Sequence, residues 1–127
     1  MSGIDEFLVE AMAISGALGV ALVDWTSGLA VATAGAGPGG DHEAGAVEVA
    51  ELARVVLLHR SFADPVGSES APEDLILSTP GCYHLIRFLP ALLDATLLLH
   101  LRLDRGGANL ALARRQLHSI GQGLVDR

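Results

Sequence analysis

Histidine is the residue type of this chain that most readily suggests a metal site or acid–base chemistry. The five histidines stand at positions 42, 59, 84, 100 and 118, without the spacing of a metal-binding motif. His84 and His100 could be cross-strand neighbours on a sheet, because alternate residues of a strand share a face. A metal site needs a third ligand, and none is evident. We therefore interpret the histidines as packed or hydrogen-bonded residues and expect no metal site.

Side chains that could act as nucleophiles are few. The single cysteine, Cys82, excludes an internal disulfide bond and a cysteine-based zinc site. It follows a Pro-Gly pair and begins an apolar run, which indicates a buried structural thiol. Ser78, His84 and Asp104 can be imagined as a triad, but no nucleophile elbow surrounds any serine. We expect no catalytic residue, no cofactor and no enzymatic activity.

Two features linked to nucleotide chemistry have plainer interpretations. The glycine-rich segment 35–40 lacks the Lys-Ser/Thr ending of a phosphate-binding loop, and Pro38 removes one of its amides. We interpret this segment as a flexible connection. Arg54 could act as an arginine finger, but an arginine on a helix more often pairs with a nearby acid, here Glu51 or Glu48.

The apolar content of the chain is high, with half of the residues apolar and a mean hydropathy of +0.45. The longest uncharged apolar run, 11–23, has 13 residues, whereas a membrane-spanning helix needs about 20. Asp5, Glu6 and Glu10 occupy the part where a secretory signal carries basic residues. We predict a soluble, cytoplasmic protein without membrane insertion, which hides its extra apolar surface against a partner.

Charge is distributed unevenly along the sequence. The net charge is −7, with a balance of −10 over residues 1–74 and +3 over residues 75–127. An acidic chain repels the phosphates of nucleic acid, so we expect no nucleic-acid partner. The asymmetry could steer a protein partner onto one face, or it could be scattered, solvated charge.

Residue patterns in the first half of the chain predict a helix, a hairpin and a second helix. Apolar residues recur with helical spacing over 3–15, with Gly16 as the stop. Alternating residues predict strands at 18–23 and 29–34, joined by a turn from Asp24 to Gly28 that contains the turn formers Asp, Ser and Gly. Asp41 is a suitable N-cap for a long helix over 42–60.

The second half predicts three strands and a last helix. After a loop over 61–72, the strands are expected at 74–78, 83–88 and 95–103, separated by a turn at 79–81 and a connection at 89–94. The last strand is apolar on one face and partly on the other, as central strands are. Asn109 or Asp104 caps a helix that begins at 110 and ends at Gly121 and Gly123.

These elements give the order α-β-β-α-β-β-β-α. The fold class is α/β (α+β), with a single five-stranded, mainly antiparallel sheet and helices on both faces. We predict one domain over residues 1–127.

The helix over 42–60 is apolar on two sides. Its inner stripe consists of Ala46, Val49, Ala53, Val56 and Leu57. The opposite side also carries apolar residues, set among charged ones: Val47, Val55 and Leu58 among Glu48, Glu51 and Arg54. A helix that packed only on its own sheet would not need this second set, so we expect it to contact something else as well.

Three segments in this order resemble the roadblock-type dynein light chain family and its bacterial relatives of the MglB kind, over residues 5–121. They are GVALVDWTSGLAVATAG, EDLILSTPGCYHLIRFL and ATLLLHLRLDRGGANLALARRQL. The first matches two strands and an Asp-containing turn, the second matches two further strands, and the third matches the last strand and helix. The first turn is one residue longer than is usual in the family and contains Trp25, and the loop over 61–72 is long and acidic.

The resemblance implies a roadblock/profilin-like fold and a homodimer, in which the strands at 74–78 join two sheets edge to edge and the second helices lie side by side. It also implies an adaptor or regulator of a small Ras-like GTPase, in a bacterial signalling complex with a sensor kinase. Such a protein would reach a membrane only through its partners, and the family offers no catalytic residues to transfer. The implied dimer or GTPase interface comprises Val47, Glu48, Glu51, Arg54, Val55, Leu58, Leu75 and Leu77.

A small-ligand-sensing domain is the alternative function, since the same layered architecture also builds such domains. A sensor needs a cavity lined by a few convergent polar groups. The predicted core consists of Leu, Val and Ala with little polarity, which favours the adaptor.

Overall fold

The computed structural model describes residues 3–63, 72–89 and 96–125, and confirms the predicted order of elements. The helices are α1 (Gly3–Met12), α2 (His42–Leu58) and α3 (Leu110–Val125). The strands are β1 (Ala17–Asp24), β2 (Leu29–Gly35), β3 (Asp74–Ser78), β4 (Cys82–Phe88) and β5 (Leu97–Asp104). Two short 3₁₀ helices, η1 (Pro38–Gly40) and η2 (Arg60–Phe62), precede and follow α2.

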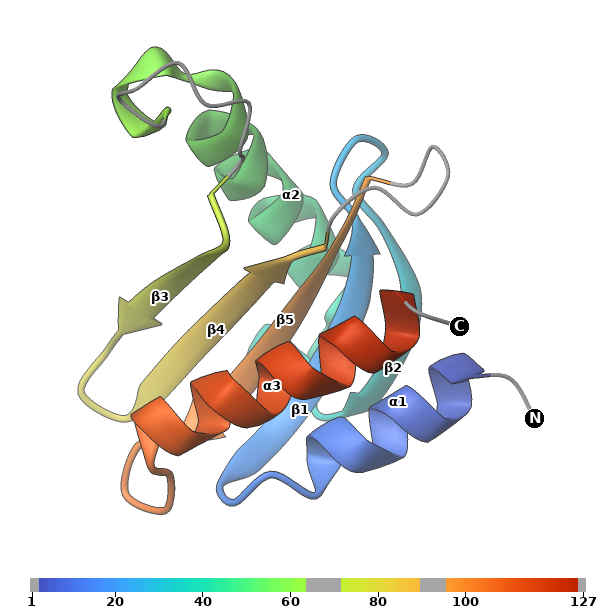
Figure 1. Ribbon diagram of the computed structural model, residues 1–127, viewed down its shortest axis with the longest axis vertical. Helices are drawn as coiled ribbons and strands as arrows, with labels where there is room; N and C mark the ends of the chain where they lie inside the picture. The colour runs from blue at the N-terminus through green and yellow to red at the C-terminus, as the bar shows by residue number, and fades with distance from the viewer. Residues whose placement is uncertain (1–2, 64–71, 90–95, 126–127) are drawn as a thin grey trace.

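The five strands form one antiparallel sheet in the order β2-β1-β5-β4-β3 (Figure 1). β5 is central, as its two apolar faces predict, and β2 and β3 form the edges. Leu98 and His100 of β5 point to one face, whereas Leu99, Leu101 and Leu103 point to the other, and all five are buried.

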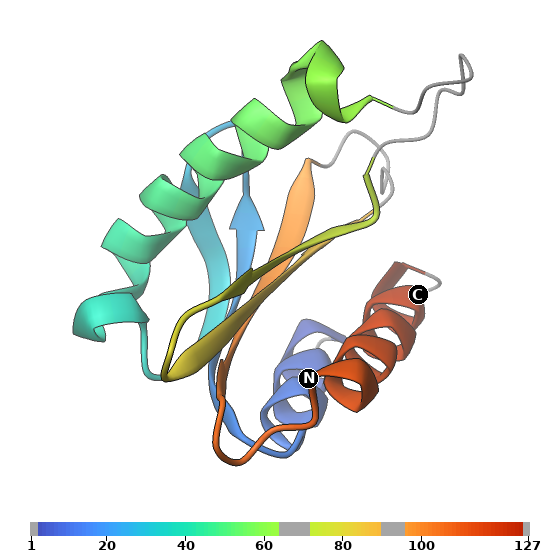
Figure 2. The same ribbon diagram turned by 90° about the vertical axis from the view of Figure 1, so that its left-hand side faces the viewer.

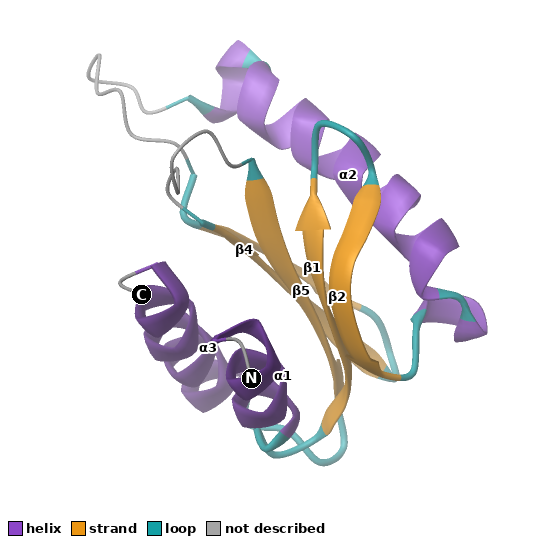
Figure 3. Cartoon of the chain, turned by 90° about the vertical axis from the view of Figure 1, so that its right-hand side faces the viewer, coloured by secondary structure: helices purple, strands orange, loops and turns teal. Residues whose placement is uncertain are grey.

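Helices cover both faces of the sheet (Figures 2 and 3). α2 lies alone on one face, over a core that includes Val23, Ile86, Phe88 and Leu98. α1 and α3 lie side by side on the other face, over a larger core. The predicted class, a single sheet with helices on both faces, is therefore confirmed.

Local chemistry explains where the two longer helices begin. The side chain of Asp41 accepts hydrogen bonds from the amides of Glu43 and Ala44, at 3.0 and 3.1 Å, which confirms it as the N-cap of α2. Asn109 plays the same part for α3, since its Oδ1 accepts from the amide of Leu112 at 3.1 Å. Of the two candidate caps for α3, the structure thus selects Asn109.

Several predicted boundaries are wrong by a few residues. α1 ends at Met12 rather than at 15, and α2 ends at Leu58 rather than at 60. The expected flexible connection at 35–40 contains η1, and the expected loop after α2 begins with η2. The predicted connection 89–94 and the predicted first residue of the last strand lie mostly outside the described residues.

The larger error concerns the end of α3, which continues through both glycines to Val125. Gly121 is buried, and a Cβ atom there would lie 3.3 Å from Leu89 Cδ2 and 3.4 Å from Leu99 Cδ1. This glycine therefore allows a close approach of the helix to the sheet. A glycine that serves packing gives the same sequence signal as one that ends a helix.

Candidate protein interface

One helix is too narrow to cover a five-stranded sheet. The outer strands of such a sheet lie about 19 Å apart, at about 4.8 Å for each step, whereas a helix with its side chains is about 10–12 Å wide. α2 lies mainly against β1 and β2. Within the described ranges, no helix consequently lies above the α2-side face of β3 and of part of β4 (Figure 2).

Apolar side chains are exposed along this uncovered strip and along α2. Leu77 of β3 is 49% exposed, and Leu75, two residues earlier on the same face, packs partly against the α2-side core. On α2, Val55 and Leu58 are 46% and 66% exposed. Glu48 and Leu52 on one flank of α2 line a hollow together with Leu77 of β3. We call the exposed residues of α2 and of β3 together the α2–β3 surface.

The predicted interface residues do not all lie on the same side of α2. Val47 lies beside Gly28 of the β1–β2 turn, because a Cβ atom on that glycine would lie 3.6 Å from the Cα of Val47. Glu48 is on the other flank, where it lines a hollow together with Leu77. The helical spacing of Glu51, Val55 and Leu58 places them between the two flanks, on the outer side.

Arg54 does not form the expected ion pair with Glu48 or Glu51 among the described residues. Its guanidinium instead donates a hydrogen bond to the backbone carbonyl of Trp25, at 2.6 Å. The turn that contains Trp25 is held by Asp24, whose Oδ1 accepts from the amide and hydroxyl of Thr26 and from the hydroxyl of Thr96. These hydrogen bonds, that of Thr96 first, lower the pKa of Asp24 to about 2. Arg54 thus ties α2 to the hairpin.

The hollow beside α2 has a volume of about 310 Å³ and extends to Leu77 of β3. It is lined by Pro38, Gly45, Glu48, Val49, Leu52, Leu77, His84, Ile86 and His100. Apart from Glu48 at its side and the two histidines, its walls are apolar. Sequence reasoning missed Leu52, which is 38% exposed; its position one turn after Glu48 was the available signal.

His84 and His100 form a hydrogen-bonded pair in this hollow. Their Nδ1 and Nε2 atoms are 2.9 Å apart, and the rings stack with centroids 5.2 Å apart. The interpretation of these two residues as packed, hydrogen-bonded histidines is confirmed. In the described part of the chain, no group of three His, Cys, Asp or Glu side chains is placed to hold a metal ion.

Burial keeps the histidine pair neutral. It lowers the pKa of His100 to about 4, with smaller contributions from His84, Arg102 and His42. Burial also lowers the pKa of His84, and the charge of Arg102 lowers it further. A neutral pair can share one proton as donor and acceptor, and this satisfies two ring nitrogens within an apolar layer.

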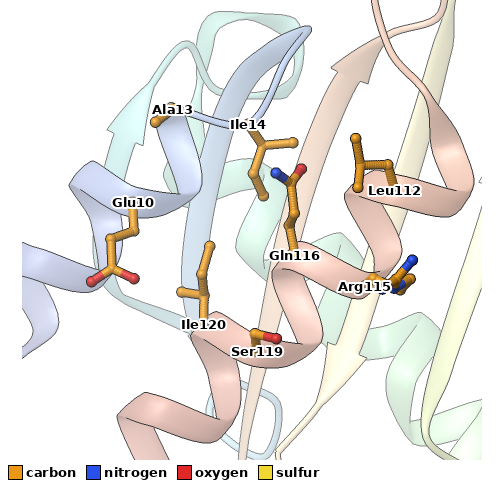
Figure 4. A pocket seen from close by; sticks show the side chains of 8 residues that line it. All are labelled: Glu10, Ala13, Ile14, Leu112, Arg115, Gln116, Ser119 and Ile120. Carbon is orange, nitrogen blue, oxygen red and sulfur yellow. The ribbon is translucent and has the colours of Figure 1, made fainter.

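A second hollow, of about 380 Å³, lies between α1 and α3 on the opposite face of the sheet (Figure 4). Ile14 lies on its α1 side, and Leu112 and Ile120 lie on its α3 side. Glu10 and Arg115 come from the two different helices and give the hollow charges of opposite sign. Both hollows are open to the surface.

Comparison with solved structures identifies the class of fold. A Roadblock/LC7 domain from Streptomyces avermitilis aligns with a TM-score of 0.67 and 14% identity, over 97% of this chain and 95% of that one. The chain therefore has the roadblock fold. No protein-family model matches the chain, and no curated protein matches it.

Within that class, the chain is similar to MglB structures. MglB of Myxococcus xanthus aligns with a TM-score of 0.79 and 17% identity, over 98% of this chain and 86% of that one. A structure described as MglB with tetrameric arrangement aligns with a TM-score of 0.75 and 20% identity, over 96% and 85%. The resemblance drawn from the sequence is thus confirmed at the level of the fold. Among the described residues, no helix is both long and apolar enough to cross a membrane.

Proposed function

We propose that this protein is a non-enzymatic, homodimeric adaptor that binds a small Ras-like GTPase. The observation that carries the proposal is the α2–β3 surface, where a helix with exposed Val55 and Leu58 lies beside a sheet edge with exposed Leu77. Apolar side chains gathered next to an edge strand are typical of a surface that another chain covers.

A second copy of the chain fits this surface for a reason of geometry. β3 is an edge strand whose outer backbone groups can pair with another strand. If two copies paired through β3 about a two-fold axis, each would bring its own α2 towards the uncovered strip of the other. Such pairing would bury Leu77 and the side of the hollow near Leu52, and the described neighbour with a tetrameric arrangement is consistent with self-association.

The GTPase would bind across the outer sides of the paired α2 helices. Glu48, Glu51, Val55 and Leu58 there combine acidic and apolar side chains, a combination suited to a partner with a basic, partly apolar surface. Val47 and Arg54 would border this surface on the side of the hairpin. We place the complex in the bacterial cytoplasm, with a sensor kinase as a further member, in keeping with the fold shared with MglB.

Light scattering and a pull-down with small Ras-like GTPases of the same organism, in both nucleotide states, test the proposal. The wild-type chain should be at least dimeric and should retain the GTPase. Leu77→Asp should prevent the pairing, since two carboxylates would be buried at the two-fold axis. Val31→Asp, at a residue 51% exposed on the far edge strand β2, is the matched control.

The readouts separate the two parts of the proposal. A wild-type chain that stays monomeric at high concentration contradicts the dimer. Failure to retain the GTPase in either nucleotide state contradicts the adaptor role, even for a chain that dimerises.

A further inference from the structure

A third hollow, of about 290 Å³, lies between β4 and α3, on the face of the sheet opposite to α2. We call it the arginine hollow, and it is lined by Glu73, Arg87, Arg114, Arg115, His118 and Ser119. Basic side chains outnumber acidic ones here, although the chain as a whole has a net charge of −7. A local excess of positive charge on an acidic protein indicates a site that attracts an anion.

Two elements supply the hydrogen-bond donors of the arginine hollow. Arg87 comes from β4, and the other donors come from α3, which lies over this part of the sheet (Figure 1). Along α3, Arg114 and His118 are one turn apart, and so are Arg115 and Ser119. Donors therefore approach the hollow from the strand and from two adjacent rows of the helix.

One carboxylate holds two of the guanidinium groups close together. Oδ2 of Asp74 lies 2.6 Å from Nε of Arg114 and 3.9 Å from Nη1 of Arg87. Arg114 also donates a hydrogen bond from Nη2 to Oδ1 of Asp74, at 3.4 Å. This two-point contact fixes the orientation of the Arg114 guanidinium and leaves its Nη1 for another acceptor.

The remaining basic groups have donors that the chain does not use. The side chain of Arg87 is only 14% exposed, yet its contacts with Glu73 and Asp74, at 3.7 and 3.9 Å, are longer than hydrogen bonds. Arg115 and His118 are exposed. Within the described ranges, none of these three basic side chains makes a hydrogen bond. A ligand in the hollow can therefore accept hydrogen bonds from several charged donors at once.

We propose that the arginine hollow binds the phosphate group of a small hydroxylated molecule, such as a sugar phosphate or a polyol phosphate. A phosphate monoester offers three acceptor oxygens and carries a charge of about −1.5 to −2 at neutral pH. A carboxylate offers two coplanar oxygens and a single charge, so it would engage fewer of the donors that come from β4 and α3. The phosphate group thus matches both the number and the directions of the donors.

The size of the hollow and Glu73 define the rest of the ligand. A volume of about 290 Å³ is at the lower end of the range of ligand sites, about 300–1,000 Å³, and it leaves room for only a small group beside the phosphate. The side chain of Glu73 lines the hollow and is 72% exposed. An ionised carboxylate only accepts hydrogen bonds, so it suits hydroxyl groups and disfavours a second anionic group.

This inference does not depend on the proposed function. Arg87 and Leu77 lie on opposite faces of the sheet, so ligand binding in the arginine hollow and pairing through the α2–β3 surface are measured separately. A chain that fails to retain a GTPase can still bind the phosphate, and the reverse also holds.

Isothermal titration calorimetry of the full-length chain tests the inference, with glycerol 3-phosphate as the probe at constant ionic strength. We expect saturable binding of one molecule per chain, weaker binding of inorganic phosphate and no binding of glycerol. Arg115→Ala removes a charged donor and should weaken the binding of glycerol 3-phosphate about tenfold. Arg60→Ala, at an exposed arginine outside the hollow, is the matched control and should leave the affinity unchanged. Circular dichroism confirms that each variant is folded.

A second variant tests the hydroxylated part of the ligand. Glu73→Ala removes the acceptor for hydroxyl groups, so it should reduce the preference for glycerol 3-phosphate over inorganic phosphate. An unchanged preference would overturn this part of the inference. The phosphate site itself is overturned if glycerol 3-phosphate shows no saturable binding, or if Arg115→Ala and Arg60→Ala weaken it equally. Tighter binding of a phosphoserine peptide than of glycerol 3-phosphate would overturn the assignment to a small free molecule.

Discussion

The two faces of the sheet differ in how completely their helices cover them. α1 and α3 together extend across one face and bury a core that includes Phe7, Leu85, Leu101 and Leu117. α2 alone covers part of the other face, where the core contains several alanines and leaves Leu77 exposed. Small residues let α2 approach the sheet closely, but they bury little area.

This difference shows that apolar residues serve two purposes in one small domain: they stabilise the fold, and they form a surface that another molecule can cover. On the face covered by α1 and α3, which we call the two-helix face, most of the large side chains that point at the sheet stabilise the fold of the single chain. On the face covered by α2, which we call the one-helix face, part of the apolar area remains available for another molecule. The high mean hydropathy of the chain thus reflects both a core and a surface.

The largest effect should come from Leu101→Ala, on the two-helix face. Leu101 is 0% exposed, so its truncation leaves a cavity and should lower the free energy of unfolding by about 2–5 kcal/mol. Leu58→Ala, at a residue 66% exposed on α2, should change it by less than about 0.5 kcal/mol. Urea denaturation of dilute protein measures both, and similar losses would contradict the contrast between the two faces.

Acid should destabilise the one-helix face in particular, through His100. Burial, together with His84, Arg102 and His42, lowers its pKa to about 4, while the unfolded chain titrates near 6.5. Between these pH values the unfolded state binds more protons than the folded state. The contribution of neutral His100 to the free energy of unfolding is therefore fully present above about pH 6.5 and is lost as the pH falls towards about 4. The expected loss is about 3 kcal/mol. Glu48 also lines the hollow and would partly offset it.

Urea denaturation at several pH values in this range measures the loss. His100→Leu should flatten the pH dependence, whereas His118→Asn, at an exposed position of α3, should keep it. A wild-type stability that stays constant from about pH 6.5 to 4 would contradict a neutral, buried pair.

Removing either helix cap should have a smaller and similar effect on both faces. Asp41→Ala deprives the amides of Glu43 and Ala44 of their acceptor, and Asn109→Ala does the same for Leu112. Each variant should lose about 1 kcal/mol. Thermal unfolding of the two variants side by side checks this, and Asn109→Asp, which keeps an acceptor, should recover most of the loss at its position.

The smallest effect is a gain in stability at Gly123. A Cβ atom there meets nothing within 4 Å, and the residue lies inside α3. Gly123→Ala should therefore stabilise the protein by about 0.5–1 kcal/mol. An unchanged or lowered melting temperature would contradict a helix that continues through this position.

Much of the fold could be predicted because its signals are local. Alternation predicts β1 and β2, the position of Asp41 before a helical stripe predicts the start of α2, and Thr79-Pro-Gly predicts the turn before β4. The end of α3 could not be predicted, since the role of Gly121 depends on the neighbouring Leu89 and Leu99.

The candidate interface was predicted only in part. Helical periodicity predicts that Val55 and Leu58 lie on the outer side of α2. It does not show that Arg54 contacts the carbonyl of Trp25, or that Leu52 and Leu77 share a hollow with His84. Those contacts join residues that are 29 or more positions apart in the sequence or that lie on different elements.

The sequence by itself determined the order of the elements, the N-cap of α2 and the two apolar sides of that helix, because each depends on residues within a few positions of one another. Only the tertiary structure decided which surfaces remain open. In the part of the chain that the structure describes, one helix over five strands leaves Leu77 of β3 exposed, and the packing of α1 beside α3 sets Glu10 and Arg115 on either side of one hollow. Width and proximity in space are properties of the assembled layers, and no local pattern encodes them.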